Sequence, residues 1–359
     1  MKANAFRVSL EYVRGSISGQ LDSVEITGPT LRASDGQWWT EATLPQPISA
    51  TMTLPFSKFV SIVRTLDDDD DIKIEPKGTT CRVKAESAIW ELNLLKTPTD
   101  PLLEFQPINT IEASGHALLK ARKRLKHLIL PFLARQGLMR AWTNENKELV
   151  IGNGPSLGGY HIGIEGLELP NNVLSEIWRI LSVRQSEKMT FHIGEKYIRV
   201  TMQDGYFQFA LSKGPTFPTD LYNKVRNLLN EDPQEMEMSP SALLRAINQV
   251  RATAGQESTL KLAPGTGGLA LMTDDECGDK SRSKIEANGT LKEPVSLNIE
   301  HLESAVEVLS DELMILKACK SVVQVSDTKG WEVIPRIREV PNPKVKEKNA
   351  HDTSEPQDS

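Results

Sequence analysis

The chain has 359 residues, of which 39% are hydrophobic and 25% charged, a composition typical of a soluble globular protein with two or three domains. Its three cysteines form no CxxC pair, which disfavours a disulfide framework or a zinc site and favours the reducing cytoplasm. The net charge of −6 excludes a generally basic surface, and without a long apolar run we expect no signal peptide or membrane span.

The first residues fit either a strand or a helix, because apolar residues recur at both spacings. Phe6, Val8 and Leu10 alternate as in a strand, whereas Phe6, Leu10, Val13 and Ile17 follow a helical spacing. Both interpretations stay open at this stage. Strands are expected next at Ser23–Ile26, Thr30–Ala33 and Trp38–Thr43.

A helix followed by three alternating strands occurs three times, and this repeat is the strongest signal in the sequence. The clearest copy covers residues 167–211, where a helical apolar stripe precedes three strand patterns separated by Gly194 and Asp204-Gly205. The other copies open at Leu54 and Leu297. The chain is therefore predicted to contain three related domains.

Proline-rich linkers divide these domains. Pro98, Pro101 and Pro107 mark the first boundary, and Pro233 marks the second. The residues after Pro341 are charged and poor in apolar side chains, which predicts a disordered tail. The predicted bounds are 1–108, 109–232, 233–340 and, for the tail, 341–359.

Domains two and three each pair two helix-plus-strands units. Their first helices begin near Ser114 and near Ser239-Pro240, where an N-cap serine precedes proline at the first helical position. Counting back at the same spacing places the matching helix of domain one at about residue 1. We therefore expect the first strand and helix of domain one to be shortened or missing.

The helix expected from Ser114 to about Leu130 has an apolar side and a basic side. No acidic residue is interleaved, although ordinary surface helices mix both signs. A solvated face is the alternative, and we interpret the basic side as a phosphate-facing surface. Its residues are Lys120, Arg122, Lys123, Arg124, Lys126 and His127.

Clustered carboxylates at Asp67–Asp71 could indicate a divalent metal, but no histidine or further acidic residue stands at ligand spacing. A solvated loop is the better interpretation, and a metal-dependent nuclease is the distant alternative. The six histidines form no HExxH pair, and the sequence contains no Walker motif and no GxGxxG motif. We therefore expect no enzyme, no cofactor and no metal.

The order and spacing of these units resemble the bacterial sliding clamp, the beta subunit of DNA polymerase III, over residues 20–338. The segments that carry the resemblance are TLPFSKFVSIVRTL, ELPNNVLSEIWRIL with its strands, Phe217-Pro218 followed by Tyr222–Val225, which is similar to the family's FPDYRRV turn, and the C-terminal WEVIPRIR. The resemblance implies an α+β DNA-clamp fold with three repeated domains of paired helix-plus-antiparallel-strand units, the first domain shortened.

The resemblance also implies a function. Such a protein encircles duplex DNA as a homodimeric ring, contacts the phosphate backbone without sequence specificity, and acts in the cytoplasm as a processivity factor in DNA replication. Its partners would be a DNA polymerase or another protein with a clamp-binding motif, and a clamp loader. Besides the six basic residues above, the helices offer Arg179, Arg245, Arg251, Lys58 and Arg64 as DNA-binding candidates.

In that family a pocket between domains two and three binds partner peptides. The matching segments here supply Leu138, Leu157, Ile162, Pro218, Leu221, Val225, Val333, Ile334 and Pro335. The family's TDGHRLA-like loop is replaced by GPSLGGY at Gly154–Tyr160, while Arg336 and Arg338 add positive charge. We therefore expect weak binding of the standard clamp-binding peptide and better binding of a more acidic one, with the tail as a competitor.

Two departures from the family support an alternative function. The helix at Glu300–Ser310 carries Glu300, Glu303 and Glu307 without a basic residue, and the first domain is predicted to be shortened. The alternative is a clamp-like adaptor or decoy that binds replication proteins without encircling DNA.

Overall fold

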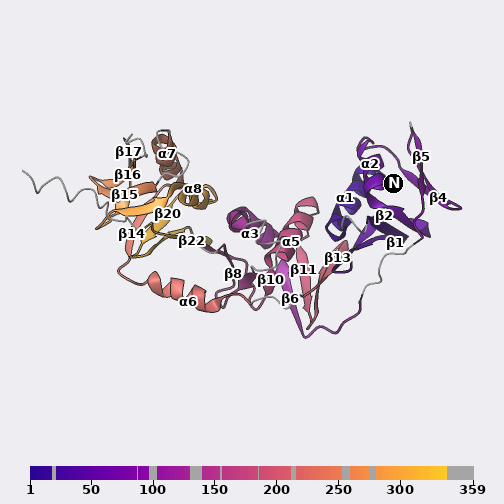
Figure 1. Ribbon diagram of the computed structural model, residues 1–359, viewed down its shortest axis with the longest axis horizontal. Coiled ribbons are helices and arrows are strands. Elements are labelled where there is room, and N and C mark those ends of the chain that lie inside the picture. The colour runs from indigo at the N-terminus through magenta and orange to yellow at the C-terminus, as the bar shows by residue number, and fades with distance from the viewer. Residues whose placement is uncertain are drawn as a thin grey trace, which may run out of the picture. The chain divides into compact units, whose positions relative to one another are not determined.

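The structure is a computed structural model (Figure 1). It describes residues 1–17, 22–86, 88–96, 103–129, 140–153, 156–184, 186–211, 216–252, 259–274 and 280–337. The chain forms two compact units. Unit 1 comprises Met1–Asn223 with Thr328–Glu332, and unit 2 comprises Lys224–Asp327 with Val333–Ser359.

The N-terminal part of unit 1 begins with helix α1 (Ala3–Val13), followed by a 3-10 turn at Arg14–Ser16. Phe6, Leu10 and Val13 are buried on one side, so the helical spacing prevails over the alternation. Two long antiparallel strands and a separate three-stranded sheet, joined by helix α2, complete this part. The bounds are β1 Ser23–Ser34, β2 Trp38–Pro55, α2 Phe56–Arg64, β3 Lys73–Lys77, β4 Thr80–Lys84 and β5 Ile89–Asn93.

Helix α1 has no side-chain cap at Lys2, and a loop distant in sequence supplies its partners. The backbone N–H of Ala3 donates to the carbonyl oxygen of Asp70 at 2.9 Å, and that of Asn4 to the carbonyl oxygen of Asp68 at 3.2 Å. Lys2 and Arg7 form ion pairs with Asp71 and Asp68. Because the first N–H groups of a helix lack partners within it, the aspartate loop stabilises the start of α1.

The second part of unit 1 holds two further repeat helices. Helix α3 is capped by Ser114, whose hydroxyl accepts from the N–H of Ala117 at 3.3 Å. A 3-10 turn at Lys126–Leu128 follows the helix, which thus ends before the predicted Leu130. The bounds are β6 Asn109–Ser114, α3 Gly115–Leu125, β7 Arg140–Thr143, β8 Glu148–Gly152, β9 Leu157–His161, β10 Glu168–Pro170, α5 Asn171–Val183, β11 Lys188–Ile193, β12 Tyr197–Met202 and β13 Gly205–Ala210. Helix α6 (Thr219–Leu228) follows, and its residues through Asn223 belong to unit 1 and the rest to unit 2.

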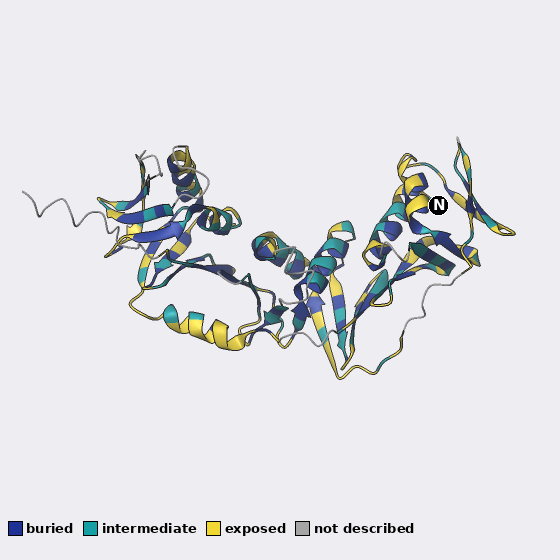
Figure 2. Ribbon diagram, in the orientation of Figure 1, coloured by how far each residue is buried: buried dark blue, intermediate teal, exposed yellow. Residues whose placement is uncertain are grey.

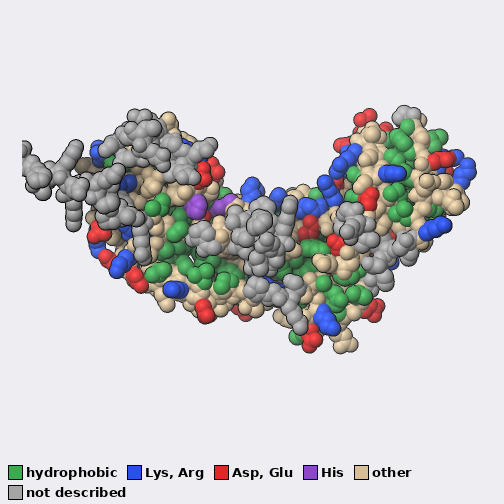
Figure 3. Space-filling view, in the orientation of Figure 1, with side chains coloured by type: hydrophobic (Ala, Val, Ile, Leu, Met, Phe, Trp, Pro, Cys, Tyr) green, Lys and Arg blue, Asp and Glu red, His purple; other side chains and the backbone are tan. Residues whose placement is uncertain are grey.

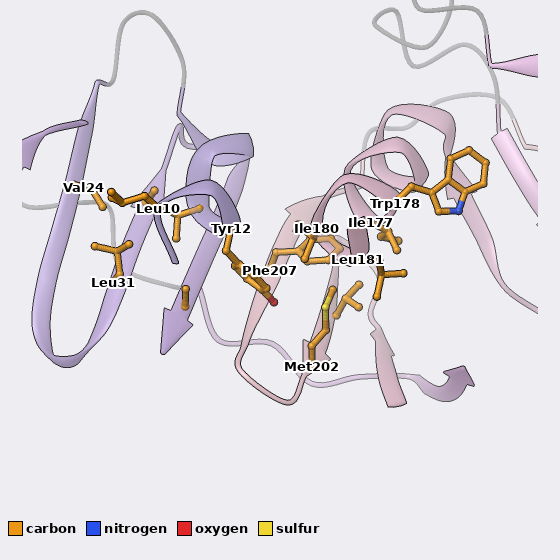
Figure 4. Packing of buried hydrophobic residues seen from close by; sticks show 14 of the residues in the cluster. Leu10, Tyr12, Val24, Leu31, Ile177, Trp178, Ile180, Leu181, Met202 and Phe207 are labelled. Carbon is orange, nitrogen blue, oxygen red and sulfur yellow. The ribbon is translucent and has the colours of Figure 1, made fainter. Parts of the chain in front are cut away.

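One six-stranded sheet joins the two parts of unit 1, in the order β1-β2-β13-β12-β11-β6. Strands β13 and β2 pair antiparallel with Phe207 opposite Thr40. Helices α1, α5 and α3 lie side by side along this unit, with their buried residues toward the strands (Figures 1 and 2). The core includes Phe207 and Ile180, which lie next to Tyr12 of α1, and Ile177, which lies farther along α5 beside Leu181 (Figure 4).

Unit 2 repeats the arrangement with helices α7 and α8 packed together. Four strands form a sheet in the order β17-β16-β15-β19, while β21, β20, β14 and β18 are successive neighbours in another. The first residues of β22, through Glu332, belong to unit 1 and the rest to unit 2. The bounds are β14 Gln234–Met238, α7 Pro240–Arg251, β15 Thr259–Gly265, β16 Gly268–Asp274, β17 Lys280–Glu286, β18 Asn288–Gly289, β19 Val295–Asn298, α8 Ile299–Glu307, β20 Met314–Ala318, β21 Val322–Ser326 and β22 Gly330–Pro335.

The predicted α+β class and the three copies of a helix with three strands are confirmed. Among the described residues of the first domain, those before α1 form an isolated bridge, between Lys2 and Asp71, and no named strand. Its helix is not shortened, however, because α1 and α3 both have 11 residues. A further difference is α6, which forms a helix where a turn was expected after Phe217-Pro218 and buries Tyr222.

Candidate functional site

The solvent side of α3 carries lysines without acidic neighbours on the helix. Lys120 and Lys123 on α3, and Lys126 just after it, are exposed, and their side chains bond to no described residue. Helix α3 contains no acidic side chain, and its last turn is basic, which suits the negative end of the helix dipole. That stabilisation needs only a charge near the helix end, so it leaves these ammonium groups available to an external anion.

Two predicted members of this surface have internal partners instead. Arg124 is only 2% exposed, and its Nη2 donates to the carbonyl oxygen of Gly330 at 3.4 Å. The Nε2 of His127 lies 2.8 Å from a carboxylate oxygen of Glu332, a residue that is itself buried. Arg124 and His127 therefore attach α3 to the segment that begins β22, and their assignment to a phosphate-facing surface is corrected.

Three arginines on other helices are also held by described partners. Arg179 of α5 donates to the carbonyl oxygens of Glu11 and Tyr12 at the end of α1 and pairs with Glu176. Arg64 of α2 pairs with Glu11 at 2.9 Å, and Arg251 of α7 pairs with Glu300 and Glu303 of α8. Arg179 in particular has a structural role, because its guanidinium joins two helices.

The remaining predicted basic residues are available. Lys58 and Arg245 are exposed, Arg122 is half-buried, and none of the three bonds to a described side chain. Lysine and arginine side chains gather along the upper side of unit 1, over α3, α5 and α1 (Figure 3). The basic surface is thus narrower than the sequence suggested and centres on Lys120, Lys123 and Lys126.

Buried residues recur at the same spacing in the first helices of the three domains, which identifies equivalent positions. The position directly before the last buried residue of each helix is Tyr12 in α1, Arg124 in α3 and Gln249 in α7. Tyr12 and Arg124 are 1% and 2% exposed, whereas Gln249 is exposed. Burial also raises the pKa of Tyr12 well above its ordinary value. Arg179 of α5 contacts Tyr12, and Gly330 at the start of β22 contacts Arg124. Gln249, in contrast, lines an open groove of about 590 Å³ beside β17.

The sheet edges differ between the repeats in the same way, because one is paired within the chain and two are terminal. In unit 1 the last strand of one three-stranded set, β13, pairs with β2. Strands β5 and β17 end their sheets, in the orders β3-β4-β5 and β17-β16-β15-β19. Ile89 on β5 is 63% exposed, which is unusual for a large apolar side chain on a sheet edge.

The predicted peptide-binding residues divide by burial. Leu157 and Ile162 in unit 1, and Val333 and Ile334 in unit 2, are buried, so the expectation that they offer apolar surface is corrected. Their burial is that of core residues. Leu138 lies outside the described residues. The residues that remain accessible are Pro218 and Leu221, both exposed, and Val225 and Pro335, both half-buried.

Sequence reasoning missed an aromatic cluster in unit 1, formed by Trp142, Phe217, Tyr222 and Trp331. Trp142 stacks on Phe217 at 5.3 Å between ring centroids and meets Tyr222 edge-on at 5.4 Å. Asn144 donates to the Tyr222 hydroxyl and to Glu148, which accepts from the Trp331 indole. The only sequence signal was the presence of four aromatic residues in segments far apart.

The described residues contain no cluster of side chains suited to hold a metal ion. Among them, no helix is long and apolar enough to cross a membrane.

Comparison with known proteins shows the fold. No protein-family model and no curated protein matches the sequence. Solved structures match almost the whole chain. The DNA polymerase III subunit beta from Pseudomonas aeruginosa has a TM-score of 0.77 at 18% identity, covering 94% of this chain and 99% of that chain. The DNA polymerase III beta subunit from Thermotoga maritima has a TM-score of 0.78 at 14% identity, covering 95% and 99%.

A third solved structure, the beta sliding clamp of C. crescentus, has a TM-score of 0.77 at 15% identity, covering 94% and 98%. The chain therefore has the DNA-clamp fold. The predicted resemblance to the bacterial sliding clamps is confirmed in its fold, with the low identity of a divergent sequence.

Proposed function

We propose that this protein is a non-catalytic, sliding-clamp-like protein of the cytoplasm that binds duplex DNA and tethers a DNA polymerase or another DNA-processing protein. The observation that carries the proposal is the set of lysines on and just after acid-free α3, Lys120, Lys123 and Lys126, whose side chains have no partner among the described residues. Flexible ammonium groups bind phosphates and do not read base edges, so binding is independent of sequence and compatible with sliding. The DNA-clamp fold supports this function.

Replacement of Lys120, Lys123 and Lys126 with glutamate tests the proposed DNA surface. Salt-sensitive retention on nicked circular DNA should fall for every sequence, because three phosphate contacts are replaced by repulsion, and the slope of log K against log salt should decrease by about 2 to 3. The matched control carries glutamate at Lys73, Lys77 and Lys96, which are exposed residues on or beyond the sheet of β3, β4 and β5. Equal losses in both variants would contradict the assignment to α3.

The proposed assembly is a homodimeric ring loaded onto DNA by a clamp loader. Strands β5 and β17 terminate their sheets, and pairing between copies would use their unpaired backbone groups. The groove beside β17 is the place where a second copy would cover α7, as neighbouring residues cover α1 and α3.

The partner surface is proposed to include exposed Pro218 and Leu221 and half-buried Trp142, which packs on the buried rings of Phe217 and Tyr222. An extended peptide with an apolar anchor suits such a surface, because these side chains are apolar and the polar groups of the buried cluster already have partners. Weak binding of the standard clamp-binding peptide remains our prediction.

A second candidate function is an adaptor or decoy that binds replication proteins without encircling DNA. It is favoured by α8, where Glu300 and Glu307 are exposed and Arg251 is the paired cation. Retention on circular DNA but not on linear DNA supports the ring, whereas equal release from both supports the adaptor.

A further inference from the structure

A second surface of unit 2 is polar and rich in cations. It is a cavity of about 530 Å³, and its polar and charged lining residues are Lys261, Glu293, Ser296, Lys320, Ser321 and Arg336. Three cations thus line the cavity with one carboxylate. None of these residues belongs to the basic surface of α3 or to the aromatic cluster.

Arg336 is held in place without neutralisation by a described carboxylate. Its Nη1 donates to the carbonyl oxygen of Cys319 at 3.0 Å, and its Nη2 donates to that of Pro294 at 3.1 Å. Both acceptors are neutral, so the guanidinium keeps its full charge, and its remaining N–H groups can serve another acceptor. Lys320 is exposed beside it, and its side chain bonds to no described residue.

The cavity lies on the side of the sheet away from the helices. Leu260 and Leu262 of β15 belong to the core that packs against α7 and α8. Because successive side chains of a strand point to opposite faces, Lys261 between them points away from those helices. A DNA duplex bound along the helices would therefore not reach this cavity, so a protein segment is the better occupant.

We propose that this cavity binds the carboxylate of an acidic residue in a peptide segment of a partner protein. Lys320 and Arg336 supply the charge, Ser321 offers a hydroxyl, and the partly exposed Ile337 beside them accepts an adjoining apolar residue. Ion pairs with a positioned guanidinium are stronger than neutral hydrogen bonds, so the site discriminates a carboxylate from an amide. This inference rests on the proposed function, because the partner is a protein carried by the clamp, and it assigns the expected preference for an acidic peptide to the cavity of Lys320 and Arg336.

Binding of two matched peptides tests the site. The probes are fluorescein-labelled octapeptides with two adjacent leucines followed by two glutamates or, in the twin, two glutamines. By fluorescence anisotropy without DNA, the full chain should bind the glutamate peptide about 10-fold more tightly at low salt, since a charged hydrogen bond contributes about 1.5 kcal/mol. Lys320→Glu should remove most of this preference and leave binding of the glutamine twin unchanged.

Controls separate the outcomes. Lys77→Glu makes the same charge change at an exposed residue of β3 and should keep the preference. Equal binding of the twins, or a preference that survives Lys320→Glu combined with Arg336→Gln, would overturn the proposal. Full competition by an eight-nucleotide single-stranded DNA that no longer binds Lys320→Glu would also overturn the proposal, because the site would then bind phosphates. DNA retention is measured separately. If the protein is not retained on DNA but keeps its preference for the glutamate peptide, only the proposed ring is contradicted.

Discussion

At the residue scale, Lys123 and Arg124 show how adjacent cations take different roles. Both were predicted on the basic side of α3, yet Lys123 is exposed and Arg124 is buried under Gly330. The helical period predicts which side a residue occupies, but it cannot show that a segment some two hundred residues later covers part of that side. The sequence therefore predicted the exposed lysines and could not predict the buried arginine.

Replacement of Arg124 should reduce stability, whereas replacement of Lys123 should not. Arg124→Gln removes a buried hydrogen-bonded group and should cost about 2 kcal/mol, lowering the melting temperature of unit 1 by about 4 to 8 °C. Lys123→Gln, at an exposed position, should change stability by less than about 0.5 kcal/mol. Thermal melting followed by circular dichroism measures both, and equal melting temperatures would contradict the structural role of Arg124.

Gly159 explains another departure from the expected motif. A Cβ at Gly159 would lie 2.5 Å from the ring of Trp331, so the backbone of β9 must be bare where that indole packs. GPSLGGY was predicted only to lack a familiar loop. Its structural reason depends on the tertiary contact with Trp331, which no local pattern in the sequence reveals.

At the element scale, helices and strands with strong periodicity were predictable, and those stabilised by distant partners were not. The stripe of α5 and the alternation of β11, β12 and β13 identify these elements locally. Helix α1 depends on the aspartate loop for its first hydrogen bonds, and α6 is anchored by Tyr222 on Trp142. Both therefore remained ambiguous or unexpected from the sequence.

The contact between α1 and α2 should depend on pH through Glu11. Partial burial raises the pKa of Glu11, but hydrogen bonds from Arg64 and Arg14 outweigh it and hold the pKa below its ordinary value of 4.5. A carboxylate with a lowered folded pKa adds stability above its unfolded pKa, and that stability is lost as the pH falls toward the folded pKa. Glu11→Gln should therefore flatten the loss of stability below about pH 4.5.

Melting temperatures of unit 1 between pH 7 and pH 3 test this expectation. The wild-type curve should fall more steeply than that of Glu11→Gln, while Glu312→Gln, at an exposed carboxylate of unit 2, should follow the wild type. Parallel curves for the wild type and Glu11→Gln would show that the Arg64–Glu11 contact contributes nothing to the acid response.

At the scale of the whole molecule, a contact between repeats within one chain predicts how two copies of the chain would associate. Arg64 in TLPFSKFVSIVRTL is equivalent to Arg179 in ELPNNVLSEIWRIL. Arg179 donates to the carbonyl oxygens of Glu11 and Tyr12 in α1, whose counterparts in α7 are Asn248 and Gln249. Arg64 of a second copy is therefore the group that would reach Asn248 and Gln249, with β5 of that copy beside β17.

This contact predicts a dimer that depends on Arg64 and on the edge of β5. Sedimentation equilibrium should give twice the monomer mass of 39.9 kDa. Arg64→Glu should raise the dimer dissociation constant at least 10-fold, because a carboxylate would face carbonyl oxygens, and Ile89→Asp should weaken the dimer by charging an exposed apolar edge residue. Lys73→Glu, on β3 at the opposite edge of that sheet, is the matched control. A monomeric wild type, or a dimer unaffected by both variants, would contradict this assembly and favour the adaptor function.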